Sequence, residues 1–183
     1  MHSLQGQVLV ATQQLRDPNF AKSVVLLVTH NSQGALGLVL NRPTNVQLEK
    51  AWTQLSESPC VHASHLYLGG PCQGPLMALH TQADLSDSEV LPGLFFTAKP
   101  EELTTLVGSD DGPIRFFVGY AGWGPGQLEN EMQEGSWHTG AAESNYAFDT
   151  ADRLWEQITK QFADAQLIAD LHIKHVPADP SLN

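Results

Sequence analysis

The sequence of 183 residues is poor in basic side chains. It has nine Lys and Arg against 20 Asp and Glu, a formal net charge of −11. The basic residues are spread singly from Arg16 to Lys174 and form no cluster. Non-specific nucleic-acid binding depends on Lys and Arg that displace phosphate counterions. Direct DNA binding is therefore not expected, and the acidic surface also disfavours anionic membranes.

Cysteine and long apolar runs are also scarce. Cys60 and Cys72 are the two thiols of the chain, too few for a disulfide scaffold. The apolar run at residues 23–28 is much shorter than the roughly 20 residues that cross a bilayer. Residues 1–6 contain neither the basic nor the apolar region of a secretory signal. We therefore expect no membrane span and no signal peptide.

The composition does support a folded core. Hydrophobic residues make up 42% of the chain and charged residues 16%, which excludes wholesale disorder. No repeat, low-complexity tract or linker divides the sequence, so residues 1–183 are expected to form a single domain. The segment from Val176 has two prolines and little apolar content, and we expect this tail to be frayed.

Short strands with a few interspersed helices are predicted. Apolar and β-branched runs bounded by turn residues predict strands at 7–12, 23–30, 35–41, 66–68, 76–80, 94–97 and 114–121. Apolar residues at helical spacing predict helices at 47–55, from Pro100, and at 151–162, with a short helix possible at 127–133. There is no regular βαβ alternation. The pattern predicts an α+β fold with a mostly antiparallel or mixed sheet.

A group of potential zinc ligands lies in the middle of the chain. Cys60, His62, His65 and Cys72 are ligand types that zinc accepts. Their spacing matches no established zinc motif, and the alternative is a loop with two histidines and two unrelated thiols. We expect no metal and no other cofactor.

Cys72 also follows a Gly-Gly-Pro turn whose backbone N–H groups could stabilise an oxyanion, and His80 lies downstream. The alternative is that Cys72 is a small buried hydrophobic residue.

Residues 119–126 contain four glycines. A glycine loop before a helix is a generic anion site, but no lysine follows, so this segment is not a P-loop. The alternative is a tight turn that lets Trp123 pack and directs Gln127 into a cleft. We expect an ordered turn, with Gln127 opening a short helix and Tyr120 or Trp123 beside a concavity.

Glu129, Glu131 and Glu134 follow that segment. Paired carboxylates can act as acid and base or hold a divalent cation. The alternative is a solvated helix face.

Several segments resemble the YqgE/AlgH family of bacterial proteins. They are residues 6–11, 17–20, 23–31, 34–43, 69–71, 79–80, 93–97, 117–131 and 135–137, in the family's order. The strongest block is FVGYAGWGPGQLENE at residues 117–131. The resemblance implies a cytoplasmic protein in which an irregular, partly split sheet curls into a pseudo-barrel beside helices. It brings no reaction with it, and members are sometimes labelled transcriptional regulators.

Three positions depart from the family pattern. The family often has proline near Gln13, an acidic residue near Thr29 and an aliphatic residue at Cys72. Thr29 weakens a scheme that needs a carboxylate beside His30. An aliphatic preference at Cys72 argues against a nucleophile or metal ligand there.

The main hypothesis is a binding or regulatory module that acts through protein or small-ligand contacts. The resemblance and the predicted loops and strand ends, where binding residues concentrate, give these candidate residues: His30, Asn31, Asn41, Arg42, His80, Tyr120, Trp123, Gln127, Glu129 and Glu131. The alternative for Asn31, Asn41 and Arg42 is that they fix hairpin ends. The rival hypothesis is an enzyme that pairs His30 or His80 with Glu129 or Glu131 as acid and base.

Overall fold

The computed structural model describes residues 2–149 and 151–170, so the tail from Val176 lies outside the described residues. The strands are β1 (Gln7–Ala11), β2 (Val24–Asn31), β3 (Gly34–Val39), β4 (Pro43–Gln47), β5 (His65–Leu68), β6 (Cys72–His80), β7 (Ser88–Leu91), β8 (Leu94–Thr97), β9 (Ile114–Trp123) and β10 (Trp137–Ala141). The helices are α1 (Leu48–Trp52), α2 (Pro100–Val107), α3 (Gln127–Gln133) and α4 (Ala151–Asp170), with 3₁₀ turns η1 (Ala83–Leu85) and η2 (Ser144–Ala147).

The strands form one continuous sheet in the order β10-β1-β2-β3-β9-β6-β8-β7, with β4 and β5 attached beside β9. Among the described residues, every strand pair is antiparallel except β5 with β9. The sheet curls into a half-barrel with helices beside it, which confirms the predicted α+β class.

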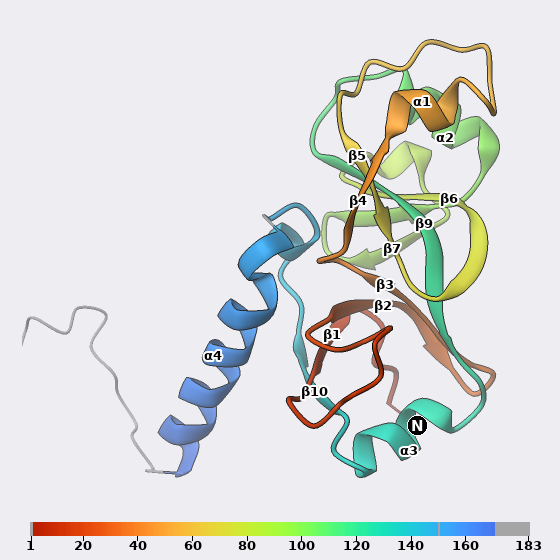
Figure 1. The fold of residues 1–183 in the computed structure, drawn as a ribbon. Helices are drawn as coiled ribbons and strands as arrows, with labels where there is room; N and C mark the ends of the chain where they lie inside the picture. The colour runs from red at the N-terminus through yellow and green to blue at the C-terminus, as the bar shows by residue number, and fades with distance from the viewer. Residues whose placement is uncertain (1, 150, 171–183) are drawn as a thin grey trace, which may run out of the picture.

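Strand β9 joins the two parts of the molecule. Figure 1 shows β1, β2, β3 and β10 with α3 in the lower part, and α1, α2 and the other strands in the upper part. The first half of β9 pairs with β5 and β6, and its last residues pair with β3. A single strand of 10 residues therefore crosses both parts, and it contains residues 117–123 of the family's strongest sequence block.

Three clusters of buried apolar residues make up the core. One lies between the sheet and α4, where Leu154 and Ile158 pack on strands β1 and β2. A second lies under α3, with Leu128 among Leu9, Trp123 and other residues. The third lies between the sheet and helices α1 and α2. The sheet buries the apolar residues predicted for α2, and it buries Leu154 and Ile158 of α4. The prediction for the first helix is corrected at its end, because α1 stops at Trp52 and Leu55 lies exposed beyond it.

Three strands were not predicted, and two were predicted too short. Strand β6 begins at Cys72, four residues before the predicted start. Strand β4 begins with a proline and is mostly exposed, β7 has four residues, and β10 contains a glycine. Their positions depend on strand pairing, as in β10, which pairs with β1 along all five residues. Strand β9 continues past the predicted end at Ala121 to Trp123, because Ala121–Trp123 pair with Gly37–Ala35.

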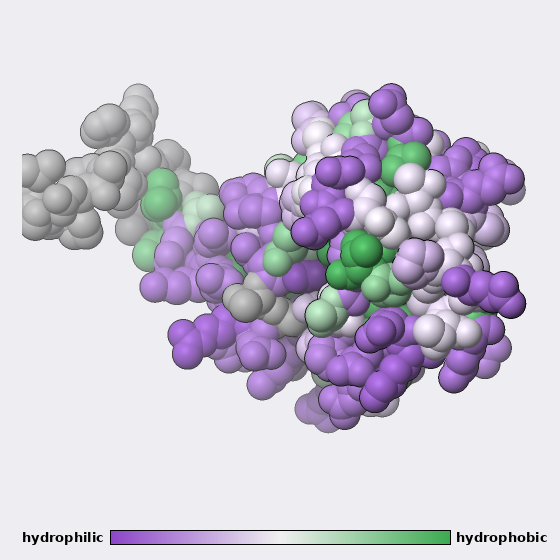
Figure 2. All heavy atoms as spheres, turned by 90° about the horizontal axis from the view of Figure 1, so that it is seen from above, coloured by the Kyte–Doolittle hydropathy of each residue, from purple (hydrophilic) through white to green (hydrophobic). Residues whose placement is uncertain are grey.

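The surface is largely hydrophilic. Figure 2 looks onto the end of the molecule that carries α1 and α2, where hydrophobic groups form a small area within a hydrophilic or neutral surround. Leu55 and Val61, in the segment after α1, are 69% and 52% exposed. Among the described helices, including the 20-residue α4, none combines the length and the apolar composition of a membrane-spanning segment.

Candidate functional site

A groove of about 460 Å³ opens where the β2–β3 hairpin meets β9 and the start of β6. The side chains at its walls are those of Thr29, Asn31, Gln33, Ala35, Leu36, Cys72, Tyr120 and Trp123. No described residue that lines it is an Asp, Glu, Lys, Arg or His. This Tyr120 groove therefore offers uncharged hydrogen-bonding groups and the aromatic rings of Tyr120 and Trp123.

The Tyr120 ring is held at both edges by glycines. A methyl group added at Gly74 would lie 2.9 Å from Cδ1 of the ring, and one at Gly122 would lie 3.1 Å from Cε2. The ring is half-buried. The two glycines thus form a slot that holds the tyrosine ring in a fixed orientation beside the groove. Because the ring is already ordered, the Tyr120 side chain would lose little rotamer entropy when a ligand binds to it.

The backbone behind Tyr120 is also tightly packed. Gly119 has φ of +70°, and a methyl group there would lie 2.8 Å from the Gly70 carbonyl oxygen and 2.9 Å from that of Cys72. Glycine is the residue that adopts this conformation without steric cost. The segment between β5 and β6 therefore passes close to β9 at the point from which Tyr120 projects.

The glycine-rich segment is a strand followed by a short turn, so the expectation of one turn over residues 119–126 is corrected. Strand β9 continues to Trp123, and Gly122 is not one of the glycines that have a positive φ angle. The turn is confined to residues 124–126. Gly126, with φ of +73°, precedes α3, and Gln127 opens that helix as predicted. Gln127 accepts a hydrogen bond from the Gly124 N–H through Oε1 at 3.1 Å, so its side chain closes the turn.

Glu131 is the acceptor at the centre of an aromatic cluster. Its Oε2 accepts hydrogen bonds from the indole N–H groups of Trp123 and Trp137, both at 2.9 Å. Its Oε1 accepts from Nε2 of Gln127, also at 2.9 Å. The Phe20 ring stacks on Trp123 and meets Trp137 edge-on, with ring centroids 6.0 and 5.4 Å apart. Glu131 therefore fixes α3 to the sheet.

His30 and Glu129 form a second polar pair on the α3 side. Nε2 of His30 lies 3.1 Å from Oε1 of Glu129, and the Leu4 N–H donates to Nδ1 at 3.0 Å. Because Nδ1 accepts a hydrogen bond, the neutral ring carries its proton on Nε2 and donates it to the carboxylate. The His30 side chain is 2% exposed and that of Glu129 is 31% exposed. The pair lies beside a pocket of about 480 Å³ that also contains His2 and Met132.

Asn31, Asn41 and Arg42 make contacts that fix turns. Oδ1 of Asn31 accepts from the Gln33 N–H at 2.8 Å. Asn41 accepts from the Val24 N–H and donates to the Lys22 carbonyl, at 2.9 and 2.8 Å. The Arg42 guanidinium donates to two backbone carbonyls, at 3.3 and 3.1 Å.

Those carbonyls belong to Pro18 and Ala21, so Arg42 holds the loop that precedes β2. The alternative that these polar residues fix hairpin ends accounts for the side-chain hydrogen bonds of Asn41 and Arg42.

His80 lies apart from the groove, at the end of β6. It is fully buried, Nδ1 accepts from the Gln82 N–H at 3.2 Å, and Nε2 has no partner among the described residues. Burial lowers the pKa of His80, and this outweighs the opposing effects of the Gln82 hydrogen bond and the Asp87 charge. His80 is therefore a neutral imidazole in the core around physiological pH.

Two of the four potential zinc ligands, Cys60 and His62, make other contacts. Cys60 Sγ contacts the His62 carbonyl at 3.5 Å, and Nε2 of His62 donates to the Leu106 carbonyl at 2.8 Å. Within residues 2–149 and 151–170, no three His, Cys, Asp or Glu side chains are grouped closely enough to hold a metal. Cys72 lies in the Tyr120 groove, while the buried His80 is at the other end of the same strand.

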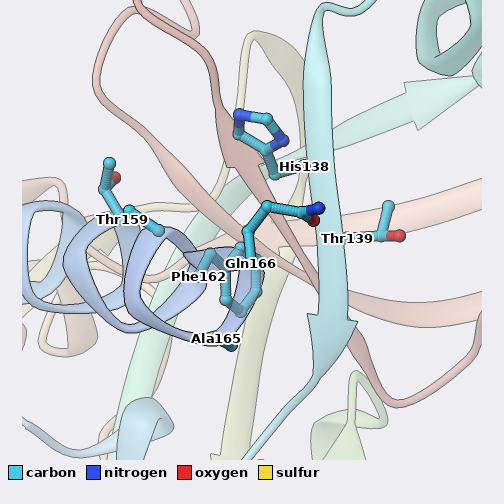
Figure 3. Close-up of a pocket in the computed structure, with 7 residues that line it drawn as sticks. His138, Thr139, Thr159, Phe162, Ala165 and Gln166 are labelled. Atoms are coloured by element: carbon cyan, nitrogen blue, oxygen red, sulfur yellow. The ribbon is translucent and has the colours of Figure 1, made fainter. Parts of the chain in front are cut away.

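A further pocket of about 480 Å³ lies between α4 and β10 (Figure 3). In the close-up, Thr159, Phe162 and Gln166 come from the helix, and His138 and Thr139 from the strand. None of the ten candidate residues lies in it.

The structure distributes those candidates over separate places. Asn31, Tyr120 and Trp123 line the groove, Gln127 and Glu131 support Trp123, and His30 pairs with Glu129. Asn41, Arg42 and His80 lie elsewhere.

Thr29 and Gln33 are polar residues of the groove that were not among the ten candidates. In the sequence, Thr29 was identified only as a departure from the family pattern. Thr29 and Asn31 are two positions apart on β2, and residues two positions apart on a strand face the same side of a sheet. That alternation is the signal that could have identified it.

Comparisons with known proteins agree on one family. A family model described as AlgH-like matches residues 8–165. A UPF0301 protein from Chlorobaculum tepidum is 39% identical over 159 residues, which cover 83% of each chain. A UPF0301 protein from Streptomyces coelicolor is 37% identical over 206 residues, covering 99% of this chain and 96% of the relative.

Two solved structures have the same fold. The solution structure of the AlgH protein from Pseudomonas aeruginosa superimposes with a TM-score of 0.74 at 30% identity, covering 97% of this chain and 96% of that one. The crystal structure of a Corynebacterium diphtheriae protein gives a TM-score of 0.72 at 24% identity over 88% of both chains. At that identity the second likeness concerns the fold alone.

Proposed function

The chain belongs to the AlgH-like family, as the resemblance in its sequence predicted, and we propose that it is a binding module whose ligand occupies the Tyr120 groove. The ligand is a neutral segment of a partner protein or a small uncharged molecule. In this proposal a regulatory effect comes from such contacts, without direct binding to DNA. We place the protein in the cytoplasm as part of the same proposal.

The observation that carries the proposal is the availability of the groove's side chains. Those of Thr29, Gln33 and Tyr120 make no hydrogen bond with any described residue, and all three line the groove. By contrast, Gln127 and Glu131 are bonded within the protein. An oriented aromatic ring with several polar groups around it is the usual composition of a ligand pocket.

The absence of charge on the described walls of the groove indicates the ligand class. A charged ligand buried there would lose hydration without gaining an ion pair. The amide groups of a blocked peptide can instead bond to the Thr29 hydroxyl and the Gln33 amide while an apolar side chain packs on Tyr120. The net charge of −11 further opposes phosphate-rich partners.

Titration with uncharged tripeptides, acetylated and amidated at their ends, tests this function. Saturable NMR shifts are expected at the amides of Asn31, Gln33 and Tyr120. Gln33→Glu introduces a charge into the groove and is expected to weaken binding. The matched control is Gln13→Glu, the same change at an exposed position outside the groove. Equal weakening by both variants, or shifts confined to another surface, would contradict the proposal.

The His30–Glu129 pair supports a second candidate, an enzyme with an acid–base site. Both ring nitrogens of His30 are already bonded, so Glu129, the more exposed member, is the group that could exchange a proton with a substrate. A panel of p-nitrophenyl esters, phosphates and glycosides tests this candidate. Turnover that Glu129→Gln abolishes and Glu134→Gln retains would support it, and absence of turnover by the native protein on the whole panel would count against it.

A further inference from the structure

Arg115 is a buried cation without a carboxylate partner among the described residues. The residue is 9% exposed, on strand β9. NH1 donates to the Leu40 carbonyl at 3.2 Å and NH2 to the Asp149 carbonyl at 2.7 Å. The guanidinium carbon lies 4.2 Å from the centre of the Tyr67 ring. No Asp or Glu of the described chain comes within ion-pair distance of it.

These contacts compensate the charge and the donors of Arg115 only in part. A guanidinium has five N–H donors, and two hydrogen bonds are formed. Burial lowers the pKa of Arg115, although the Tyr67 and Asp149 groups oppose that effect. Burial of an unpaired charge is costly, and the ring and the two carbonyls compensate only in part. The remaining donors would be satisfied by an oxyanion.

A pocket of about 370 Å³ lies beside this guanidinium. Its polar lining comes from β4, β5 and the residue before β5, with Asn45, Ser64, His65 and Tyr67 around Arg115. The side chains of Asn45, Ser64 and His65 form no hydrogen bond with other described residues. None of the described lining residues is an acid, although the whole chain has 20 Asp and Glu.

We propose that this Arg115 pocket binds a ligand through an oxyanion group, a phosphate or a carboxylate. Arg115 supplies the charge, His65 at the mouth supplies a ring N–H, and Asn45 and Ser64 supply neutral donors. Charge-assisted hydrogen bonds of this kind are the strong ones in proteins. The site is separate from the uncharged Tyr120 groove, so its ligand need not be the groove's ligand.

The proposal is tested with inorganic phosphate and with acetate, titrated separately into the full chain at ionic strength held constant with sodium chloride. The readouts are the NMR signal of the Arg115 side-chain N–H and the amides of Ser64 to Tyr67. A saturable shift with either anion is expected, and the anion that binds more tightly identifies the ligand chemistry. Arg115 is kept intact because its removal would also break the bonds to Leu40 and Asp149.

A pair of isosteric variants makes the test specific. Asn45→Asp places a carboxylate at the pocket and is expected to weaken anion binding by about tenfold or more, as a like charge nearby in a partly buried site does. Asn31→Asp makes the same charge change in the Tyr120 groove and retains the oxygen that the Gln33 N–H needs, so binding is expected to be unchanged. Equal weakening by both variants, or no saturable shift beyond that of chloride, would overturn the proposal.

Discussion

Trp123 and Trp137 donate their indole N–H groups to one and the same atom, Oε2 of Glu131. The rings also meet edge-on, with centroids 6.1 Å apart. A carboxylate is suited to this position, because one oxygen accepts both indoles while the other accepts from Gln127. The glutamate that suggested acid–base chemistry in the sequence thus holds a helix against a sheet.

Replacement of Glu131 should therefore lower stability. Glu131→Ala leaves two indole donors without their acceptor, and we expect a loss of about 2–3 kcal/mol in the free energy of unfolding. Glu131→Gln keeps one oxygen and should lose less. Urea denaturation followed by tryptophan fluorescence measures both. Glu134→Gln, on the same side of the molecule and exposed, is the control, and a loss as large in that variant would refute the assigned role.

Two glycines with similar positive φ angles should differ in the stability that is lost when each is replaced by alanine. Gly126, with φ of +73°, has no atom within 4 Å of an added methyl group, so the conformational penalty alone, about 1–2 kcal/mol, is expected. Gly119, with φ of +70°, faces two carbonyl oxygens, and overpacking should add about 1–3 kcal/mol. Thermal or urea unfolding of both variants gives the comparison. Equal losses would show that the backbone around Tyr120 relaxes freely.

The buried His80 should make the protein less stable as the pH falls. Its pKa is lowered in the folded state, so below about 6.5 the unfolded chain binds a proton that the folded chain does not. The loss begins near that pH and continues down to the folded-state pKa, at no more than about 1.4 kcal/mol per pH unit.

Unfolding free energies at pH 7.5 and 5.5 measure this effect in the native chain and in His80→Leu. The drop between the two pH values should be smaller in the variant. Asp87 also has a lowered pKa, but its contribution is lost only at more acidic pH, so it does not interfere. An unchanged drop in His80→Leu would assign the effect to other groups.

Duplex DNA is expected to bind weakly. With a net charge of −11, sequence-independent affinity at physiological salt should be no tighter than about 10⁻⁴ M. Fluorescence anisotropy with a labelled duplex measures it, and repetition at two salt concentrations separates electrostatic from other contacts. Micromolar affinity with a steep salt dependence would contradict this expectation and would favour transcriptional regulation through direct DNA binding.

Local sequence patterns determined much of the fold. Helix α2 begins at Pro100, as its proline and the acids after it predicted, and α3 begins at Gln127. Helical spacing identified the buried face of α4 through Leu154 and Ile158. These features depend on residues a few positions apart, so the sequence alone carries them. The family followed from the block around Tyr120 in the same way.

Tertiary structure decided the roles of the polar residues. Glu131 and Glu129 are two positions apart, yet one binds two indoles and the other binds His30, because the helix directs them to different parts of the sheet. Arg115 was not a candidate residue, because it lies in a strand that is otherwise apolar. Only the fold shows that its charge is buried beside a pocket with no Asp or Glu among its described lining residues. Strands β4, β7 and β10 could also be identified only from the strands with which they pair. Pairing between distant segments is a property of the folded chain, and a local pattern does not contain it.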